Sequence, residues 1–147
     1  MMPPMLSLPL LLALPGCPEG GESAPEETAA VVDSEAPVVE SATVTCFQHT
    51  TGEAFVQWTG NATASDPQGL STIETFGTLA VRDARGDLGE ASLVCADGAC
   101  TTSWRDHEFD IECDTIAVST YDFAFRVVDH DGHESAELVV AGEKVEE

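Results

Sequence analysis

The stretch YDFAFRV, residues 121–127, decides the fold of this chain. Its large apolar residues stand at every second position, with Asp122, Ala124 and Arg126 between them. Successive side chains of a β-strand point to opposite faces, so this period buries one face and exposes the other. The stretch therefore predicts a strand that packs on one side only.

Shorter runs with the same alternation lie along the rest of the chain, and Thr, Val and Phe are frequent in them, as strands prefer. The runs are 42–46, 54–58, 73–81, 91–95 and 136–140. Turn signals separate them: Asp-Pro-Gln-Gly at 66–69, Asp-Ala-Arg-Gly-Asp at 83–87, and Asp-Gly at 97–98 and 131–132. Six or seven short strands at this spacing predict an all-β domain, a β-sandwich in the first place and a small barrel as the alternative.

Two segments resemble bacterial immunoglobulin-like and fibronectin type III-like domains. The sequence FVQW at 55–58, followed by SDPQGL at 65–70, looks like an early strand and its loop in that family. The pattern from Tyr121 to Ser135, through Asp129 and Gly132, looks like the family's penultimate strand and final hairpin. The resemblance implies an immunoglobulin-like β-sandwich over 42–142, with Trp58 in the core and the Tyr121 hydroxyl bonded to backbone at a corner. The middle, 86–114, departs from the family and is interpreted as a hairpin insertion.

Five cysteines give the chain an odd thiol count. Four of them can form two disulfides in three ways, which sequence does not distinguish. The preferred pairs are Cys95 with Cys100, which flank an Asp-Gly hairpin, and Cys46 with Cys113, which would tie an early strand to a central one. A zinc site of Cys95, Cys100, Cys113 and His107 is the rival hypothesis, although exported cysteines usually pair with each other.

The fifth cysteine, Cys17, follows the apolar stretch 5–14. That stretch has the length of a signal-peptide core and is too short to span a bilayer as a helix. The string Leu14-Pro15-Gly16-Cys17 resembles the lipobox of bacterial lipoproteins. The resemblance implies that 1–16 is a lipoprotein signal peptide and that the Cys17 thiol carries a diacylglyceryl group. The alternative is an ordinary cleaved signal peptide with Cys17 as a spare thiol.

Composition divides the rest of the chain. Residues 17–41 are rich in Glu, Ala, Pro, Gly, Ser and Thr without a basic residue, which predicts a disordered acidic linker. Residues 42–142 form the predicted domain, and 143–147 an acidic tail. The net charge of −22, with only 5 basic residues, excludes nucleic-acid binding and attraction to an anionic membrane surface.

Two acidic segments could hold cations. Asp129, Asp131 and Glu134 could supply calcium ligands together with Asp66 from another loop, but the ligand series is incomplete. A hairpin turn that uses Asp and Gly for its backbone is the preferred interpretation. His130 and His133 could bind a transition metal or be solvated. Residues 106–114 alternate acidic and non-acidic side chains, which in a strand would place five carboxylates on one face.

No nucleophile elbow and no zincin motif is present, and the cysteines are assigned to disulfides and lipid. The sequence therefore predicts a non-enzymatic binding or structural module without a cofactor, anchored through its N-terminal lipid. It predicts a place in the cell envelope, at the outer membrane or cell surface rather than the inner membrane, and a protein or glycan partner. A calcium-dependent adhesion module is the first alternative and an exported enzyme the second.

Overall fold

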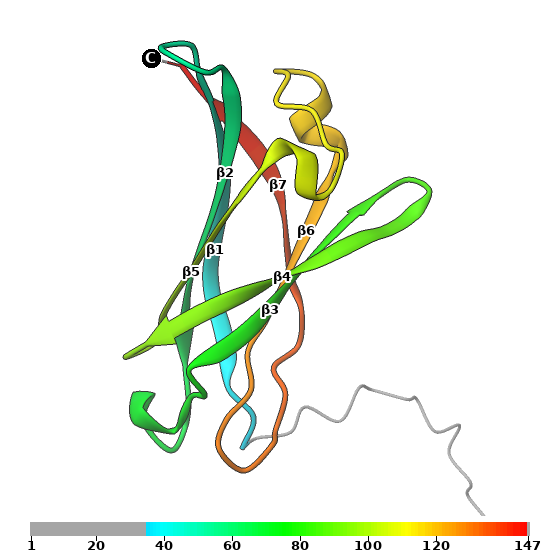
Figure 1. Ribbon diagram of the computed structural model, residues 1–147. Coiled ribbons are helices and arrows are strands. Elements are labelled where there is room, and N and C mark those ends of the chain that lie inside the picture. Colours follow the sequence, from blue (N-terminus) through cyan, green and yellow to red (C-terminus); the bar gives the residue numbers. More distant parts are fainter. Residues whose placement is uncertain (1–34, 147) are drawn as a thin grey trace, which may run out of the picture. The chain divides into compact units, whose positions relative to one another are not determined.

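The computed structural model describes residues 35–146, and the predicted signal peptide, Cys17 and most of the predicted linker lie outside this range. The prediction of an all-β domain is confirmed. The strands are β1 (Val38–His49), β2 (Phe55–Ser65), β3 (Phe76–Asp83), β4 (Gly86–Ala96), β5 (Ala99–Arg105), β6 (Asp122–Arg126) and β7 (Leu138–Val145) (Figure 1). Three short 3-10 turns connect them, η1 (Leu70–Thr72), η2 (Asp106–Glu108) and η3 (Ala117–Thr120).

The strands pair in one closed ring with the order β1-β2-β5-β4-β3-β6-β7. All neighbours are antiparallel except β1 and β7, which pair in parallel over 44–47 and 142–145. In a β-sandwich, the edge strands of the two sheets do not form hydrogen bonds with each other. Here every strand pairs with a neighbour on both sides, so the hydrogen bonding is that of a barrel, the alternative predicted from the sequence. The ring closes because β4 pairs with β3 over most of its length and crosses to β5 at 94–96.

Both predicted boundaries of the domain differ from the strand limits. β1 begins at Val38, inside the predicted linker, because Pro37 and Val39 are buried and Val39 pairs with Ala64. β7 continues to Val145, inside the predicted acidic tail, because its last residues pair with β1. In both places the acidic composition predicted a linker or tail, but backbone pairing and burial make these residues part of the barrel.

The core is built around Trp58, which is fully buried as the sequence resemblance implied. Its ring lies parallel to that of its cross-strand neighbour Trp104, with centroids 6.0 Å apart, and contacts Phe123 at 5.5 Å. Each large side chain buried in this way contributes about 1.5–3 kcal/mol. The chain of β7 approaches this cluster closely at Gly142, where a Cβ atom would lie 3.0 Å from Phe123.

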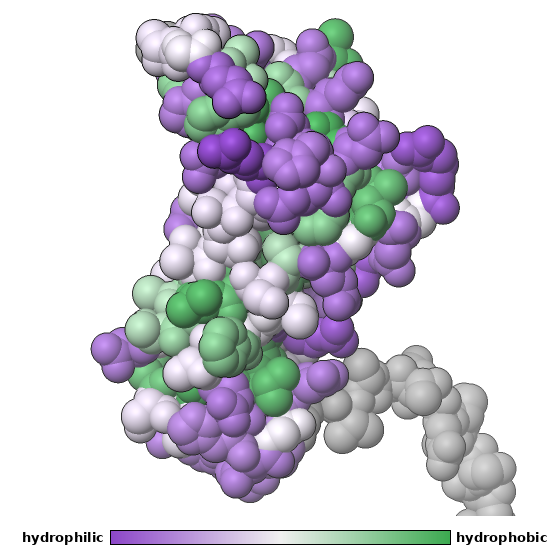
Figure 2. Space-filling model, viewed as in Figure 1, coloured by the Kyte–Doolittle hydropathy of each residue, from purple (hydrophilic) through white to green (hydrophobic). Residues whose placement is uncertain are grey.

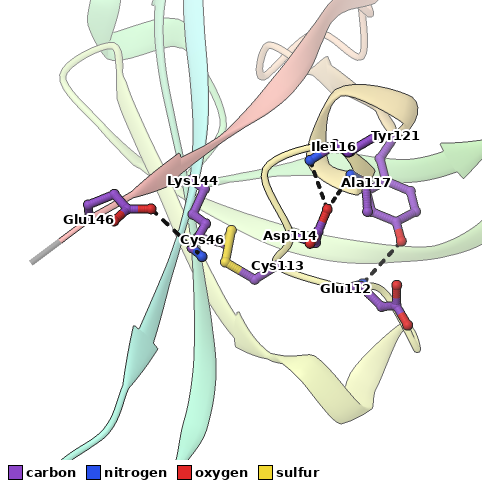
Figure 3. Close-up of a disulfide and its surroundings, with 9 residues drawn as sticks. All are labelled: Cys46, Glu112, Cys113, Asp114, Ile116, Ala117, Tyr121, Lys144 and Glu146. Carbon is purple, nitrogen blue, oxygen red and sulfur yellow. Dashed lines mark hydrogen bonds and ion pairs between the residues drawn. A yellow bond between two sulfur atoms is a disulfide. The ribbon is translucent and has the colours of Figure 1, made fainter.

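The segment between β5 and β6 is not the alternating strand predicted for 106–114. It forms η2, then a turn in which Asp110 has a φ of 52°, then η3, with Ile111 buried. Its alternation does not become a strand because its ends are tied inward: Cys113 is bonded to Cys46, and the backbone N–H of Glu112 donates to the Tyr121 hydroxyl at 3.0 Å (Figure 3). The Tyr121 hydroxyl is thus bonded to backbone, as expected from the sequence.

The predicted Asp-Gly hairpin at 97–98 joins β4 to β5, and both of its residues have positive φ. Gly98 also packs against the backbone, because a Cβ there would lie 2.5 Å from the carbonyl oxygen of Ala64. β4 and β5 belong to the ring, so 86–105 is part of the barrel rather than a hairpin insertion. No helix within 35–146 is long and apolar enough to cross a bilayer.

Candidate functional site

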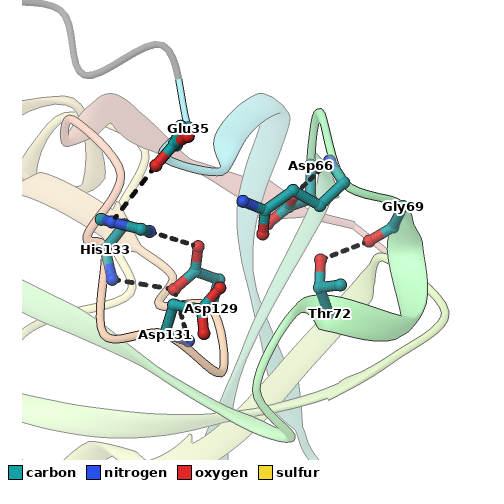
Figure 4. A network of polar contacts seen from close by, with 8 residues as sticks. Glu35, Asp66, Gly69, Thr72, Asp129, Asp131 and His133 are labelled. Atoms are coloured by element: carbon teal, nitrogen blue, oxygen red, sulfur yellow. Dashed lines mark hydrogen bonds and ion pairs between the residues drawn. The ribbon is translucent and has the colours of Figure 1, made fainter.

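The predicted calcium ligands come from two loops that lie together at one end of the barrel. The backbone N–H of His130 donates to the carbonyl of Thr72 at 2.8 Å, and that of Glu74 donates to Val128 at 2.8 Å. The loop after β2 and the loop after β6 are therefore neighbours (Figure 4). Sequence alone does not place these loops side by side.

Asp129 is the centre of this loop pair. Its side chain is buried; Oδ1 accepts from the backbone N–H of Asp131 and His133, and Oδ2 lies 2.8 Å from Nδ1 of His133. Burial raises the pKa of the Asp129 carboxyl, but the hydrogen bonds from His133 and Asp131 outweigh it and the pKa falls below its usual value. Both oxygens are thus engaged by the turn that contains them, which fits the preferred interpretation of a hairpin turn.

The other predicted ligands do not complete a calcium shell. Ligand atoms of Asp129, Asp131 and His133 lie within 4.8 Å of one another, and this group includes neither Asp66 nor Glu134. Glu134 lies 3.7 Å from Arg126. Asp66 accepts from the backbone N–H of Gln68 at 2.7 Å through Oδ1, while its Oδ2 is buried without a hydrogen-bond partner among residues 35–146.

The disulfides are Cys46–Cys113 and Cys95–Cys100, with sequence separations of 67 and 5. These are the two pairs preferred from the sequence. The rival zinc site is wrong, because Cys95 is bonded to Cys100 and Cys113 is bonded to Cys46. His107 lies on the exposed η2 turn, and His130 lies 3.9 Å from Glu74.

The acidic segment 106–114 borders a hollow with a volume of about 550 Å³. Asp106 reaches the hollow from η2, Asp110 from a turn, and Glu112 and Asp114 from the irregular stretch that follows, rather than from one strand face. The lining residues are Gln48, Val56, Asp106, His107, Asp110, Ile111, Glu112, Cys113 and Asp114.

A second surface, absent from the sequence-based predictions, lies on the outer side of β1, β2 and β5. The inward residues of these strands fill the core, so the alternate residues face solvent in cross-strand rows. We call this surface the carboxylate-free face because none of its residues is Asp or Glu. It consists of Ser41, Thr43, Thr45, Phe47, His49, Phe55, Gln57, Thr59, Asn61, Thr63, Ala99, Thr101, Ser103 and Arg105.

The composition of this face contrasts with that of the chain. The protein has 27 acidic residues, yet the outward positions of three adjacent strands carry none over 41–49, 55–63 and 99–105. The nearest carboxylate of β1, that of Glu40, lies just beyond this range and accepts a hydrogen bond from the Ser65 hydroxyl. Figure 2 shows pale and green residues over the region where Figure 1 places β5 and the end of β4, with purple residues above and below. Carboxylates border this surface: Glu40 precedes it on β1, and Glu143 of β7 pairs with Thr45 at its edge.

The small side chains at one end of the face leave a shallow hollow of about 320 Å³. Two cross-strand bonds order its walls: the Ser41 and Thr63 hydroxyls lie 2.6 Å apart, and the Thr101 hydroxyl donates to Oδ1 of Asn61 at 3.0 Å. Within 35–146, the Thr43 hydroxyl and the amide nitrogen of Asn61 have no hydrogen-bond partner. The lining residues are Ser41, Ala42, Thr43, Asn61, Ala62, Thr63, Ala99, Cys100 and Thr101.

Exposed apolar side chains continue the surface from the hollow across β4 to β3. Thr101 pairs with Val94, and Val94 pairs with Phe76. Val94 is 55% exposed and Phe76 is 65% exposed, and Leu70, which is 46% exposed, lies against the β4–β5 hairpin near Gly98. Scattered apolar residues on a surface are ordinary, but a contiguous set beside a hollow is typical of a binding site.

At its other end the face finishes in a stack of aromatic and basic groups. The His49 ring stacks on Phe55 with centroids 4.4 Å apart, and Phe47 meets His49 edge-on at 4.6 Å. The Arg105 guanidinium lies over the Phe55 ring at 4.3 Å, a cation–π distance. These contacts hold the side chains in fixed positions, which lowers the entropy cost of binding against them.

Sequence reasoning missed this surface because Ser and Thr are common at the outward positions of any strand. The signal was present in the alternation itself, since the outward positions of 41–49, 55–63 and 99–105 all lack Asp and Glu. Only the pairing of β5 with β2 places them on one surface. No protein-family model, no curated protein and no solved structure matches the chain.

Proposed function

We propose that this protein is a non-enzymatic binding module of the cell envelope, held by a lipid on Cys17 and displayed on an acidic linker. The observation that carries the proposal is the carboxylate-free face. Protein surfaces that bind partners are depleted of Asp, Glu and Lys at their centre and enriched in aromatic residues and Arg. The face follows this composition: it has no carboxylate and includes Phe47, Phe55 and Arg105.

Covalent features of the domain support a place outside the cytoplasm. Disulfides persist in oxidising compartments, and both pairs are formed within residues 35–146. The remaining cysteine, Cys17, stands in the string that resembles a lipobox. A diacylated terminus with two hydrocarbon chains is sufficient for stable anchoring. We propose the outer membrane or the cell surface as its location.

The order of the strands supports a relationship to immunoglobulin-like domains. In that fold the strands A, B, E and D form one sheet, and C, F and G form the other. Lettered in chain order, the ring found here reads A-B-E-D-C-F-G. The contact at the Tyr121 hydroxyl is a second family feature. We propose that the barrel is an immunoglobulin-like sandwich whose two edges have closed, at β3–β4 and at the parallel pair β1–β7.

The anchor is tested by the intact mass of protein extracted from membranes with detergent. We expect a chain that begins at Cys17, with a mass increase equal to a diacylglyceryl group and two disulfides in the remaining cysteines. A protein that retains residues 1–16, or one with an unmodified Cys17 thiol, would overturn this part of the proposal.

Binding is tested with the full chain in which Cys17→Ser removes the lipid site, mixed with an isolated envelope fraction and sedimented. Thr101→Glu introduces a charge into the middle of the carboxylate-free face, and we expect it to reduce the bound fraction by at least tenfold. Thr115→Glu makes the same change at an exposed residue outside the face and should leave the bound fraction unchanged. Equal binding by both variants would contradict a role for the face.

A calcium-dependent adhesion module is the second candidate. The observation that favours it is the buried Oδ2 of Asp66, which has no hydrogen-bond partner within the described range, in a loop beside the Asp129 turn. A melting curve with calcium and with a chelator separates the candidates. A calcium-induced rise in Tm that disappears in Asp131→Asn would favour this second function, and coincident curves would reject it.

A further inference from the structure

We propose that the carboxylate-free face binds an uncharged polysaccharide, with the sugar chain lying across the strands from the hollow to Phe76. The proposal deepens the proposed function and depends on it, because it names the partner of the same face. Three properties of the surface lead to it: its charge, its extent, and the order of its polar and apolar groups.

Charge selects the class of partner. Anionic polymers would be repelled, because the face is set in a chain with a net charge of −22. A basic partner would be drawn to the carboxylates around the 106–114 hollow rather than to a surface that has none. An uncharged polymer is neither repelled by the acidic surroundings nor attracted to them. This face is therefore the favourable place for such a polymer to bind. The Arg105 guanidinium lies over the Phe55 ring, 4.3 Å from its centroid.

The extent of the face argues against a second copy or another globular protein. Three strands about 4.8 Å apart, with five outward residues about 6.8 Å apart, give an area on the order of 400 Å². A standard protein interface buries about 800 Å² on each partner. The face has about half that area, and the row that crosses it from Thr43 to Phe76 is only one residue wide on each strand, which matches a single extended chain better than a folded protein.

The order of groups gives the direction of the sugar chain. In register, the row runs from Thr43 on β1 through Asn61, Thr101 and Val94 to Phe76 on β3. Its first half offers hydroxyl and amide groups to the hydroxyls of a sugar, and the Thr43 hydroxyl and the Asn61 amide nitrogen are available for new bonds. Its second half offers the exposed Phe76 ring, and an aromatic ring packs well against the C–H groups of a pyranose.

The hollow provides the deepest point of this path. Its volume of about 320 Å³ lies at the lower end of the range for small-ligand sites, about 300–1,000 Å³. The small lining residues, among them Ala62 and Ala99, produce the depression that larger side chains would fill. We expect one or two sugar units to occupy it, with the rest of the chain crossing Val94.

The test is affinity electrophoresis of the Cys17→Ser full chain through native gels that contain a neutral glucan, mannan, xylan or galactan. Gels with carboxymethylated glucan or polygalacturonate serve as anionic counterparts. We expect retardation by at least one neutral polymer and by neither anionic polymer. Because no ion pair is involved, the apparent Kd should change less than twofold between low and high salt.

Variants locate the site. Thr101→Glu, which fills and charges the hollow, and Phe76→Ala, which removes the exposed ring, should each weaken retardation at least tenfold. Thr115→Glu should behave as the wild type, and circular dichroism shows whether each variant is folded. Retardation that persists in both Thr101→Glu and Phe76→Ala would overturn the proposal.

The outcomes also separate this inference from the proposed function. If the face variants abolish binding to the envelope fraction while no neutral polymer retards the protein, the polysaccharide proposal fails and the binding module stands. If sedimentation of the wild type reveals a dimer that Thr101→Glu dissociates, the face is occupied by a second copy and the polysaccharide proposal fails. If the envelope fraction binds all variants equally, both proposals fail.

Discussion

Two outer surfaces of one barrel have opposite chemistry. The outward positions 41–49 of β1, 55–63 of β2 and 99–105 of β5 carry hydroxyl, amide, methyl, aromatic and basic groups without a carboxylate. On the other side, Arg82 of β3 donates two hydrogen bonds to Glu137, both at 2.8 Å, and one to Asp87 at 2.7 Å. Both surfaces stand on the same core, so their difference cannot come from packing.

The two sides also differ in how their strands are tied together. Three of the four paired cysteines lie in β1, β4 and β5, whereas β3, β6 and β7 contain no cysteine. On the β3 side, charged groups provide the links: the hydrogen bonds that Arg82 donates to Glu137 and Asp87 raise the pKa of its guanidinium, and Arg82 lowers the pKa of Glu137. Disulfides therefore tie the strands on the side of the carboxylate-free face. Ion pairs in that place would have put carboxylates on the face.

The largest expected effect comes from breaking the core that both surfaces share. Trp58→Ala removes a fully buried ring that contacts Trp104 and Phe123. We expect a loss of about 3–5 kcal/mol in the free energy of unfolding, measured by urea titration. Trp58→Phe should cost less because it retains an aromatic ring. A loss below about 1 kcal/mol for Trp58→Ala would contradict a common core.

The disulfides should differ in their contributions. The chain-entropy relation gives about 4 kcal/mol for a separation of 67 and about 2 kcal/mol for a separation of 5. We therefore expect Cys46→Ser with Cys113→Ser to lower stability more than Cys95→Ser with Cys100→Ser, measured by urea titration of the two double variants. The reverse order would mean that the Cys95–Cys100 bond of the β4–β5 hairpin stabilises the barrel more than the Cys46–Cys113 bond does.

Lowering the pH should destabilise the loop after β6, through its residue Asp129. Because its hydrogen bonds hold the pKa of Asp129 below the usual 3.8, the ionised carboxylate stabilises the fold at pH values above 3.8. This contribution is lost as the pH falls through the folded-state pKa. We expect the difference in Tm between the wild type and Asp129→Asn to be largest near neutral pH and to shrink below pH 3.8. A difference that grows on acidification would contradict the assignment.

The next effect is on the charged surface. Arg82→Gln removes the ion pairs to Glu137 and Asp87, and we expect a fall in Tm of a few degrees at most, since exposed ion pairs contribute little. The fall should diminish as salt is added, because salt screens the interaction in the wild type. Thermal melts at two salt concentrations check this. A fall independent of salt would indicate that packing of the Arg82 side chain, rather than its charge, matters.

The smallest expected effect on stability is on the uncharged surface. Thr101→Val replaces an exposed hydroxyl that bonds only to Asn61, and we expect the free energy of unfolding to change by no more than about 0.5 kcal/mol. Urea titration beside Arg82→Gln tests whether the two surfaces differ as described. A larger loss would mean that the row of hydroxyls contributes to folding.

Local patterns in the sequence predicted the strand at 121–127, the Asp-Gly hairpin at 97–98 and the preferred cysteine pairs. Periodicity did not predict ring closure, because the crossing of β4 to β5 and the parallel pairing of β7 with β1 depend on contacts distant in sequence. At 106–114 the same periodicity is misleading, since the Cys46–Cys113 bond and the Tyr121 hydroxyl fix an irregular path.

The candidate sites followed the same division. The sequence identified Asp129 and Asp131 as a polar cluster and preferred a turn, and their hydrogen bonds belong to that turn. It did not identify the carboxylate-free face, because a surface made of three strands becomes visible only when their register is known. Row partners such as Asn61 and Thr101 are 40 residues apart in the chain.

The parallel pair of β1 and β7 has a mechanical consequence. The barrel's first and last strands lie side by side in the same direction, joined over 44–47 and 142–145. Tension applied between the start of β1 and the end of β7 acts along these strands, so their hydrogen bonds are loaded in shear and must rupture together instead of unzipping singly. A domain tethered at one terminus and pulled at the other would resist stretching through this short ladder.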